Sequence, residues 1–167
     1  MLLLGEQPGD QEDRRGEPFV GPAGRILDEA LEEAGIDPAH SYVTNAVKHF
    51  KWQYASGGRG KRRIHKAPTL REMSACGPWL AAELDLTRPE VVVALGASAG
   101  KALLGSSFRV SRERGVLMER EVHGQDRRIL ATIHPSAVLR ADDEDRKNVR
   151  SGLVSDLRVA AEALRSA

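Results

Sequence analysis

Residues 91–95 read Val-Val-Val-Ala-Leu, a short apolar run whose first three residues are β-branched. Such a run is typical of a strand inside a parallel sheet whose two faces are both covered by helices. Four other segments have a strand-like composition, and residues 115–122 give the weakest of these signals. The predicted strands are therefore residues 2–4, 42–46, 91–95, 115–122 and 128–133.

Helical patterns separate these strands. Apolar residues recur at helical spacing after Pro22, and Gly35 ends that segment as a residue that tolerates positive φ. Thr69 and Glu72 have the spacing of a capping box, which starts a second helix. Because strands alternate with helices, we predict an α/β fold with a parallel sheet and helices on both faces. The predicted helices are residues 22–34, 70–86, 97–104 and 145–165.

The length of 167 residues suits one domain with a substantial core, so we expect residues 1–167 to form a single domain. No run of about 18 apolar residues is present, which argues against a membrane span. Residues 1–4 are too short, and lack the basic region, for a signal peptide. Cys76 is the single cysteine, which fits a reducing compartment. We expect a cytoplasmic protein with no membrane partner, and a monomer by default.

Positive charge is concentrated in one segment. Between Lys48 and Lys66 the chain has seven Lys or Arg residues, no Asp or Glu, and four Gly or Ser residues. Without this segment, 18 basic residues stand against 24 acidic ones, a net charge of −6 compared with +1 for the whole chain. We expect a flexible basic loop that meets a polyanion, although a charge run of this kind is more often a solvated surface loop.

Polar side chains follow several of the predicted strands. Glu6 and Gln7 come after the first strand, Asn45 ends the second, and His134 follows the last. Each of these features alone is usually structural. Since functional groups of open α/β sheets gather beyond the carboxyl ends of the strands, we expect them to form one site together with His65. The glycine-rich residues 96–100 lack the spacing of a dinucleotide fingerprint and are interpreted as a tight strand-to-helix turn.

Five motifs follow one another along the chain, namely Gly5-Glu6-Gln7-Pro8-Gly9-Asp10, Pro18-Phe19-Val20-Gly21-Pro22-Ala23-Gly24, Thr44-Asn45, Lys61-Arg62-Arg63-Ile64-His65 and His134-Pro135-Ser136. Their order and spacing resemble the uracil-DNA glycosylase superfamily, and in particular its UdgX branch. The first and last motifs mark the superfamily, whereas Glu6 and the Lys-Arg-Arg-Ile-His segment distinguish this branch from the thermophile-type iron–sulfur glycosylases. The resemblance covers about residues 5–158 and implies a three-layer αβα sandwich around a mainly parallel, four-stranded sheet.

The resemblance implies roles in base recognition. Uracil must leave the DNA stack to be reached, and Phe19 would stack on the flipped ring. The amide of Asn45 offers an acceptor and donors that match uracil N3–H and O4, whereas cytosine presents the opposite pattern. Gly5 and Asp10 complete the expected substrate-binding residues.

The resemblance also implies a catalytic set. His134 and the backbone N–H groups around Gln7 would stabilise negative charge that develops on uracil O2. In UdgX proteins the loop histidine then bonds to the sugar, and His65 occupies that position with Glu6 to orient it. The residues expected to contact DNA are Lys61, Arg62, Arg63, Lys66, Ser136 and Arg140, with residues 137–140 resembling a loop that wedges into the minor groove. Arg63 and its neighbours could instead hold the loop against the protein body.

A [4Fe–4S] cluster is typical of this branch and its relatives, and two of its four ligands form a Cys-x-x-Cys pair before the first strand. This sequence lacks such a pair, whereas His49 and Cys76 match the third and fourth ligands. We expect the cluster in a full-length protein that carries the pair; loss of the cluster is the alternative. On its own, Cys76 is equally well explained as a small buried apolar residue.

Three hypotheses follow. The first is a DNA repair enzyme that excises uracil from single-stranded, and also double-stranded, DNA and becomes covalently attached through His65. The second is a glycosylase with ordinary turnover, in which His65 only contacts the substrate. The third is a uracil-DNA-binding module without chemistry.

Overall fold

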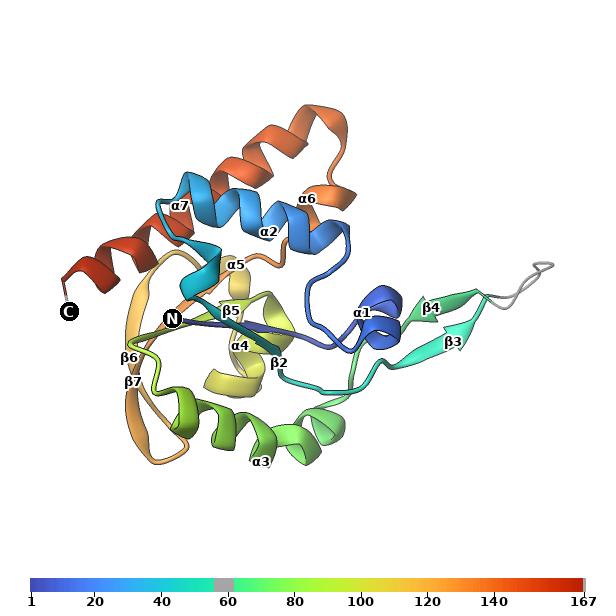
Figure 1. The fold of residues 1–167 in the computed structure, drawn as a ribbon, viewed down its shortest axis with the longest axis horizontal. Coiled ribbons are helices and arrows are strands. Elements are labelled where there is room, and N and C mark those ends of the chain that lie inside the picture. Colours follow the sequence, from blue (N-terminus) through green and yellow to red (C-terminus); the bar gives the residue numbers. More distant parts are fainter. Residues whose placement is uncertain (56–61, 167) are drawn as a thin grey trace.

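The fold is a five-stranded sheet between two layers of helices, seen in a computed structural model that describes residues 1–55 and 62–166 (Figure 1). The strand order is β2-β1-β5-β7-β6, in which the first four strands are parallel and β6 is antiparallel to β7. The strands are β1 (Leu2–Gly5), β2 (Tyr42–Asn45), β5 (Val91–Leu95), β6 (Leu117–Val122) and β7 (Gln125–Thr132). The predicted α/β fold with a mainly parallel sheet is confirmed.

The predicted number of four strands is wrong, because β6 adds an antiparallel edge strand. His123 and Gly124 connect β6 to β7, and both have positive φ, at 52° and 75°. A two-residue turn of this kind matches the twist of paired strands, so it holds β6 against β7. The weak strand signal of residues 115–122 therefore belongs to the central sheet.

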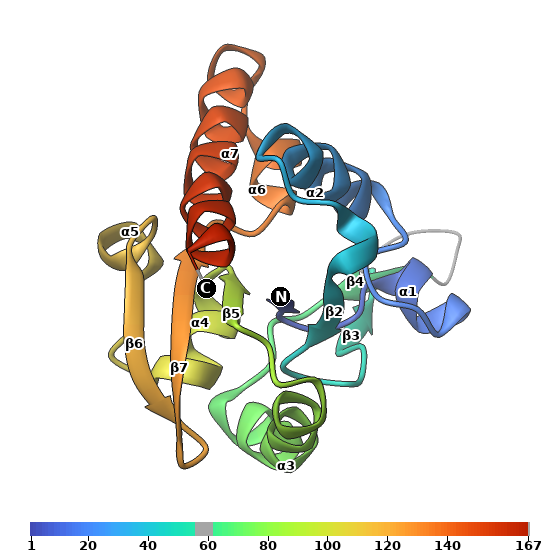
Figure 2. The ribbon, with the colours of Figure 1, turned by 60° about the vertical axis from the view of Figure 1, so that its left-hand side comes forward.

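The two helical layers follow from the alternation of side chains along the strands. Leu3 and Val93 point to the face covered by α2 (Pro22–Glu33) and α7 (Asp143–Arg165), whereas Leu2 and Val92 point to the face covered by α3 (Leu70–Thr87) and α4 (Ala97–Leu104). Figure 2 shows α2 and α7 on one side of the sheet and α3 on the other. All four of these strand residues are fully buried.

The long predicted helices are present with small shifts at their ends. The capping box of Thr69 and Glu72 starts α3, with the side chain of each residue bonded to the backbone of the other. No described helix is both long enough and apolar enough to cross a membrane. The shorter elements were not predicted, namely α1 (Asp10–Arg15), η1 (Pro38–His40), β3 (Trp52–Tyr54), β4 (Arg63–His65), α5 (Val110–Glu113) and α6 (Ser136–Arg140).

The basic segment contains regular structure on both sides of residues 56–61. These six residues lie outside the described part of the chain, so the flexibility predicted for them stays a prediction. Strands β3 and β4 pair antiparallel and project from the end of the molecule where the parallel strands finish (Figure 1). Backbone hydrogen bonds from Ala55 N–H to the Arg62 carbonyl and from Lys66 N–H to the Lys51 carbonyl extend the ladder at both ends. His65 therefore belongs to a paired strand with a fixed register.

Candidate active site

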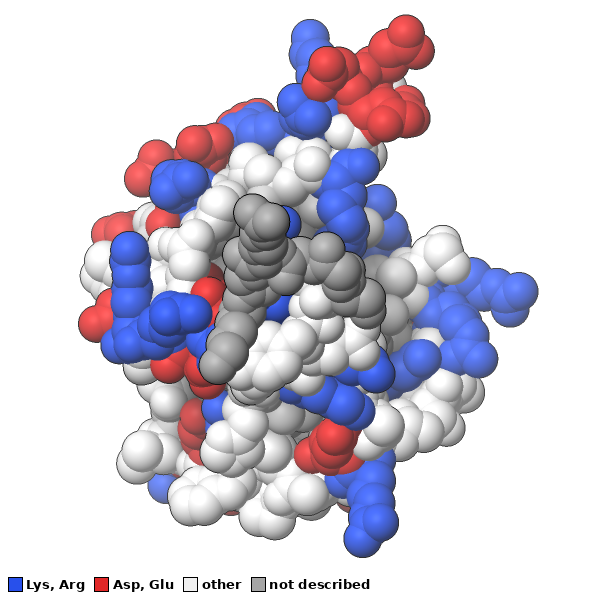
Figure 3. Space-filling model, turned by 90° about the vertical axis from the view of Figure 1, so that its right-hand side faces the viewer, with Lys and Arg blue, Asp and Glu red and all other residues white. Residues whose placement is uncertain are grey.

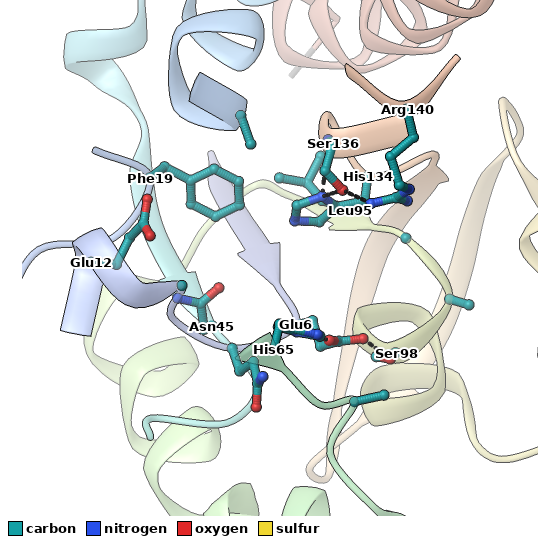
Figure 4. Close-up of a pocket in the computed structure, with 16 residues that line it drawn as sticks. Glu6, Glu12, Phe19, Asn45, His65, Leu95, Ser98, His134, Ser136 and Arg140 are labelled. Carbon is teal, nitrogen blue, oxygen red and sulfur yellow. Dashed lines mark hydrogen bonds and ion pairs between the residues drawn. The ribbon is translucent and has the colours of Figure 1, made fainter. Parts of the chain in front are cut away.

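A cavity of about 570 Å³ lies where the parallel strands end and their chains turn into helices. Its lining comes from the ends of β1, β2, β4, β5 and β7, from α1 and from the segment that leads into α2. Figure 4 shows side chains of these segments, such as those of Phe19, Asn45 and His134, around a common space. The sequence-predicted residues that line it are Glu6, Gln7, Phe19, Asn45, His65, His134, Ser136 and Arg140.

Glu6 is the centre of the charged part of the cavity. Its Oε1 lies 2.9 Å from Nε2 of His65, and its Oε2 accepts a hydrogen bond from the hydroxyl of Ser98 (Figure 4). Burial raises the pKa of Glu6, but the hydrogen bonds from His65 and Ser98 and the nearby imidazoles outweigh this effect, so the net pKa is lowered. Glu6 is therefore ionised near neutral pH and holds the imidazole of His65 by accepting its Nε2–H.

The hairpin that carries His65 is fixed at its base by Gln7. The side-chain amide of Gln7 donates to the carbonyls of Lys51 and Lys66, at 3.3 and 3.0 Å, and its Oε1 accepts from Lys51 N–H. Lys51 and Lys66 are the residues just before β3 and just after β4. Gln7 thus ties the end of β1 to both strands of the hairpin, a role that the sequence did not predict.

Arg63 fixes the hairpin from the side, which answers one of the alternatives left open by the sequence. Its guanidinium pairs with the carboxylates of Asp10 and Asp13, and lies 5.2 and 5.5 Å from the ring centroids of Phe50 and Trp52. Only 17% of this side chain is exposed. Arg63 and Asp10 hold the hairpin against α1, while the expected DNA contact of Arg63 and substrate contact of Asp10 stay predictions.

His134 follows β7 and is held from the opposite wall of the cavity. Nδ1 accepts from the backbone N–H of Ser136 at 3.1 Å and lies 2.8 Å from the hydroxyl of Ser136, which in turn accepts from Arg140 at 2.7 Å. With Nδ1 acting as acceptor, the neutral ring carries its proton on Nε2. Burial lowers the pKa of His134 to about 4, so the ring is neutral near pH 7.

Phe19 and Asn45 meet on the apolar side of the cavity because Gly5 has no side chain. A Cβ at Gly5 would collide with Oδ1 of Asn45 and would lie 2.8 Å from the Phe19 ring. Phe19 has a left-handed backbone with φ of 54°, and its ring centroid lies 5.7 Å from that of His134. Gly24 permits this path, since a Cβ there would collide with the Phe19 carbonyl. The absence of a side chain at Gly5 thus leaves room for Phe19 and Asn45 to lie side by side on the cavity wall.

Asn45 presents its amide to the cavity. The residue is only 6% exposed, and no described residue forms a hydrogen bond with its side-chain amide. Behind it, Lys48 donates to the Asn45 carbonyl and to Thr44, and pairs with Glu83 at 2.6 Å. This network fixes the backbone of Asn45, so both ends of its amide are left for a ligand.

The remaining predicted DNA contacts differ in their position. Arg62 and Lys66 are exposed and, by strand alternation, project from the face of β4 opposite to His65. Lys61 lies outside the described residues. Ser136 and Arg140 lie on α6 at the rim and are linked by their own hydrogen bond. Figure 3 views the end of the molecule from which the hairpin projects, and shows Lys and Arg side chains over several parts of this face, with Asp and Glu at its top, along its left side and in a small patch near the bottom.

Two further cavity residues escaped the sequence analysis. Ser98 begins α4 after Gly96, whose φ of 91° confirms the tight turn predicted there. A Cβ at Gly96 would lie 3.0 Å from Cβ of His134, so this glycine also permits the close approach of β7. Glu12 lies on α1 and accepts from Gly21 N–H at 2.8 Å, which holds the segment that carries Phe19. Neither a serine within a run of Gly and Ala nor a glutamate among other polar residues gave a distinguishing signal.

The described residues do not fit a [4Fe–4S] cluster. Cys76 is buried against Val47 and Met73, whereas His49 is exposed. A cluster needs four ligands, and in residues 1–55 and 62–166 no three His, Cys, Asp or Glu residues gather as a metal site. The cluster therefore stays a prediction that needs ligands besides His49 and Cys76, and no part of the site described above depends on it.

Comparison with known proteins agrees with this arrangement. The model of the family described as the uracil DNA glycosylase superfamily matches residues 1–158. The chain is 35% identical over 141 residues to the type-4 uracil-DNA glycosylase of Thermotoga maritima, covering 84% of this chain and 66% of that protein. It is 34% identical over 143 residues to the type-4 enzyme of Archaeoglobus fulgidus, covering 83% of this chain and 66% of that protein.

A more distant similarity extends to another type. The type-5 uracil-DNA glycosylase of Pyrobaculum aerophilum is 31% identical over 136 residues, covering 80% of this chain and 48% of that protein. The chain thus spans slightly less than two thirds of the length of the two type-4 relatives named above.

Proposed function

From the premise that the chain belongs to the uracil-DNA glycosylase superfamily, we propose that it excises uracil from DNA and retains the sugar on His65. The observation that carries this proposal is the 2.9 Å contact between Oε1 of Glu6 and Nε2 of His65 on the wall of the cavity. A histidine held by a carboxylate suits the role of a nucleophile, and His65 shares the cavity with Phe19 and Asn45, which suit a flipped pyrimidine.

Recognition in the proposed reaction uses the apolar wall. The uracil ring stacks on Phe19, while Oδ1 of Asn45 accepts from N3–H and Nδ2 donates to O4. The amide of Asn45 has no described partner within the protein, so uracil can satisfy it. Cytosine has an unprotonated N3 and an amino group at C4, and would face an acceptor and a donor of the wrong kind.

Bond cleavage leaves the electron pair of the C1′–N1 bond on uracil and positive charge on the sugar. Nε2–H of His134 donates toward uracil O2, where negative charge develops. A neutral ring suits this role because it donates without transferring its proton. The low pKa of His134, caused by burial, keeps the ring neutral.

Capture of the sugar completes the proposed reaction. A ring nitrogen of His65 uses its lone pair to bond to C1′, and the proton on the other nitrogen passes to Glu6 and then to solvent or to the uracil anion. Protein and uracil-DNA thus give a protein–DNA conjugate and free uracil, with no further reactant. Ser98 holds the second oxygen of Glu6, so the first faces the imidazole.

A denaturing gel tests the proposal. The protein is incubated with single-stranded DNA that contains one uracil, then heated in detergent. We expect a retarded band that survives denaturation, its loss in His65→Ser, and uracil release that persists in this variant because water reaches C1′. His40→Ser is the matched control, since His40 is exposed on η1 and paired with Asp37.

The same gel separates the other two hypotheses. DNA that breaks in alkali without forming a retarded band indicates ordinary turnover. A shift seen only in native gels indicates binding without chemistry. Either result contradicts covalent capture, and the second also contradicts excision.

A further inference from the structure

The β3–β4 hairpin carries aromatic side chains on the same face as His65. Directly paired residues of antiparallel strands share a face, and successive residues alternate between faces. Trp52 is paired with His65, and Tyr54 with Arg63, so these four side chains lie on one face. Because His65 and Arg63 contact Glu6 and Asp10, this face is the one turned toward the cavity side of the hairpin.

The two aromatic residues are used differently. The ring of Trp52 is partly covered by the guanidinium of Arg63, which lies 5.5 Å from its centroid. Tyr54 lies two pairs farther out along the hairpin and is 53% exposed. Its ring meets Trp52 nearly edge-on, at 4.8 Å between centroids and 70° between planes. An edge contact fixes the ring of Tyr54 while leaving ring surface open to solvent.

The spacing between Tyr54 and His65 suits neighbouring nucleotides. The pair that contains Tyr54 is two residues along the strand from the pair that contains His65, which corresponds to about 7 Å. Stacked nucleotides of one DNA strand rise about 3.4 Å each, so an unstacked neighbour of a nucleotide held at His65 reaches this distance. The exposed Arg62 and Lys66 add positive charge at the hairpin, which a DNA backbone requires, whereas Lys48, Lys51 and Arg63 pair with carboxylates of the protein.

We infer that Tyr54 is a stacking platform for the base next to uracil in an unpaired DNA strand. This inference rests on the proposed function, since it places the uracil sugar at His65. A base in a duplex is already stacked and paired, so the contact with Tyr54 favours single-stranded DNA. Base–aromatic stacking tolerates any sequence, and the preference is therefore for strandedness and not for a particular neighbouring base.

The test measures binding without chemistry. The probe is a single-stranded oligonucleotide with one 2′-fluoro-2′-deoxyuridine, whose fluorine destabilises the oxocarbenium ion and so prevents excision. Two further oligonucleotides lack the base on the 5′ or the 3′ side of this nucleotide. Fluorescence anisotropy gives the dissociation constants of the wild type, Tyr54→Ala, Tyr54→Leu and Tyr54→Phe. Trp79→Ala is the matched control, because Trp79 is a 67% exposed aromatic residue on α3.

We expect Tyr54→Ala and Tyr54→Leu to weaken binding of the intact strand by about fivefold to a hundredfold, the range for one stacked base. Tyr54→Phe and Trp79→Ala should bind as the wild type does. The wild type should bind one of the two base-deficient strands more weakly than the intact strand, by the same factor. Tyr54→Ala should bind that base-deficient strand as well as it binds the intact strand, as in a double-mutant cycle of two groups in contact.

Wild-type affinity in Tyr54→Ala for the intact strand would overturn the inference. So would a penalty that persists undiminished on both base-deficient strands, because the ring would then act without a stacked neighbour. Failure of the proposed function is read separately, in the denaturing gel with ordinary uracil-DNA. Thermal unfolding within about 2 °C of the wild type verifies that each variant is folded.

Discussion

The two histidines of the cavity are held in opposite ways. His134 follows a central strand, is largely buried, and has Nδ1 bonded to Ser136. His65 lies on the projecting hairpin, is half exposed, and is held by the contact of its Nε2 with Glu6. The difference matches the two demands of the proposed reaction. A group that stabilises developing charge works best when fixed and neutral, whereas a group that captures the sugar must reach C1′.

Removal of the fixed histidine should have the largest effect on excision. In His134→Ala we expect uracil release to slow by about 100- to 1000-fold, the loss typical of one oxyanion donor. Adduct formation should slow by the same factor, because capture follows excision. Single-turnover assays of both products measure this, with thermal unfolding as the control for folding. Unchanged uracil release would remove His134 from the chemical step.

Asn45, at the end of β2, belongs with His134 to the part of the cavity wall that the sheet holds in place. Asn45→Asp replaces the donor to O4 by a second carboxylate oxygen, so we expect uracil release to fall about a hundredfold and the preference over cytosine to shrink. Competition between uracil- and cytosine-containing strands measures the ratio. If the preference is unchanged, another residue reads the base edge.

The anchors of the hairpin should affect capture and leave excision almost unchanged. Arg63→Met keeps the apolar stem against Phe50 and Trp52 but removes the pairs with Asp10 and Asp13. We expect adduct formation to slow about tenfold, as for a slightly misplaced nucleophile, with uracil release within about twofold of the wild type.

The matched control for Arg63→Met is Arg62→Met, on the opposite face of the hairpin. At saturating DNA it should leave the adduct rate unchanged. Equal losses in the two variants would mean that Arg63 acts through charge on DNA and not through the position of His65.

Ser98 should have a smaller effect, through Glu6. Its hydrogen bond lowers the pKa of Glu6, so Ser98→Ala should raise that pKa and protonate the carboxylate at higher pH. We expect a loss of a few fold in the adduct rate at pH 7, and an acid limb of the adduct rate shifted to higher pH. Ser98→Thr keeps a hydroxyl that can donate to Glu6, so the acid limb of its adduct rate should lie at the wild-type pH. A uniform loss at every pH would instead indicate a packing role.

The smallest effect concerns pH and His134. Its pKa is lowered from an ordinary 6.5 to about 4 in the folded protein. The ring stays neutral as pH falls from 8 to about 5.5, so uracil release by His65→Ser should lose less than about twofold over this range. Folding stability should nevertheless fall below about pH 6.5, because the unfolded chain then binds a proton that the folded ring does not. An activity midpoint near 6.5 would contradict the buried, neutral ring.

The sequence could predict the central sheet and its helices, but not the β3–β4 hairpin. The strands around Val93 and the helices after Pro22 and Thr69 carry periodic patterns and caps that act locally, so their positions followed from the sequence. Glu6, Asn45 and His134 converge because the carboxyl ends of parallel strands meet at one edge. Their convergence could therefore be expected once the strands were placed.

The hairpin and its anchors could not be predicted in this way. The pairing of β3 with β4 depends on Gln7 and Arg63, whose partners lie more than 40 residues away in sequence. Ser98 reaches Glu6 across 92 positions, after a turn that looks ordinary. Tertiary contacts of this kind leave no periodic signal in the sequence. The segment that was expected to be a loop therefore contains a paired strand, with His65 on the face turned toward the cavity.

Covalent capture is tested most directly by mass spectrometry of the protein after reaction with a single-stranded uracil oligonucleotide. The account predicts an intact mass equal to protein plus oligonucleotide minus one uracil, with the nucleotide remnant on the peptide that contains His65. Unmodified protein beside abasic DNA, or a remnant on any other residue, would contradict it.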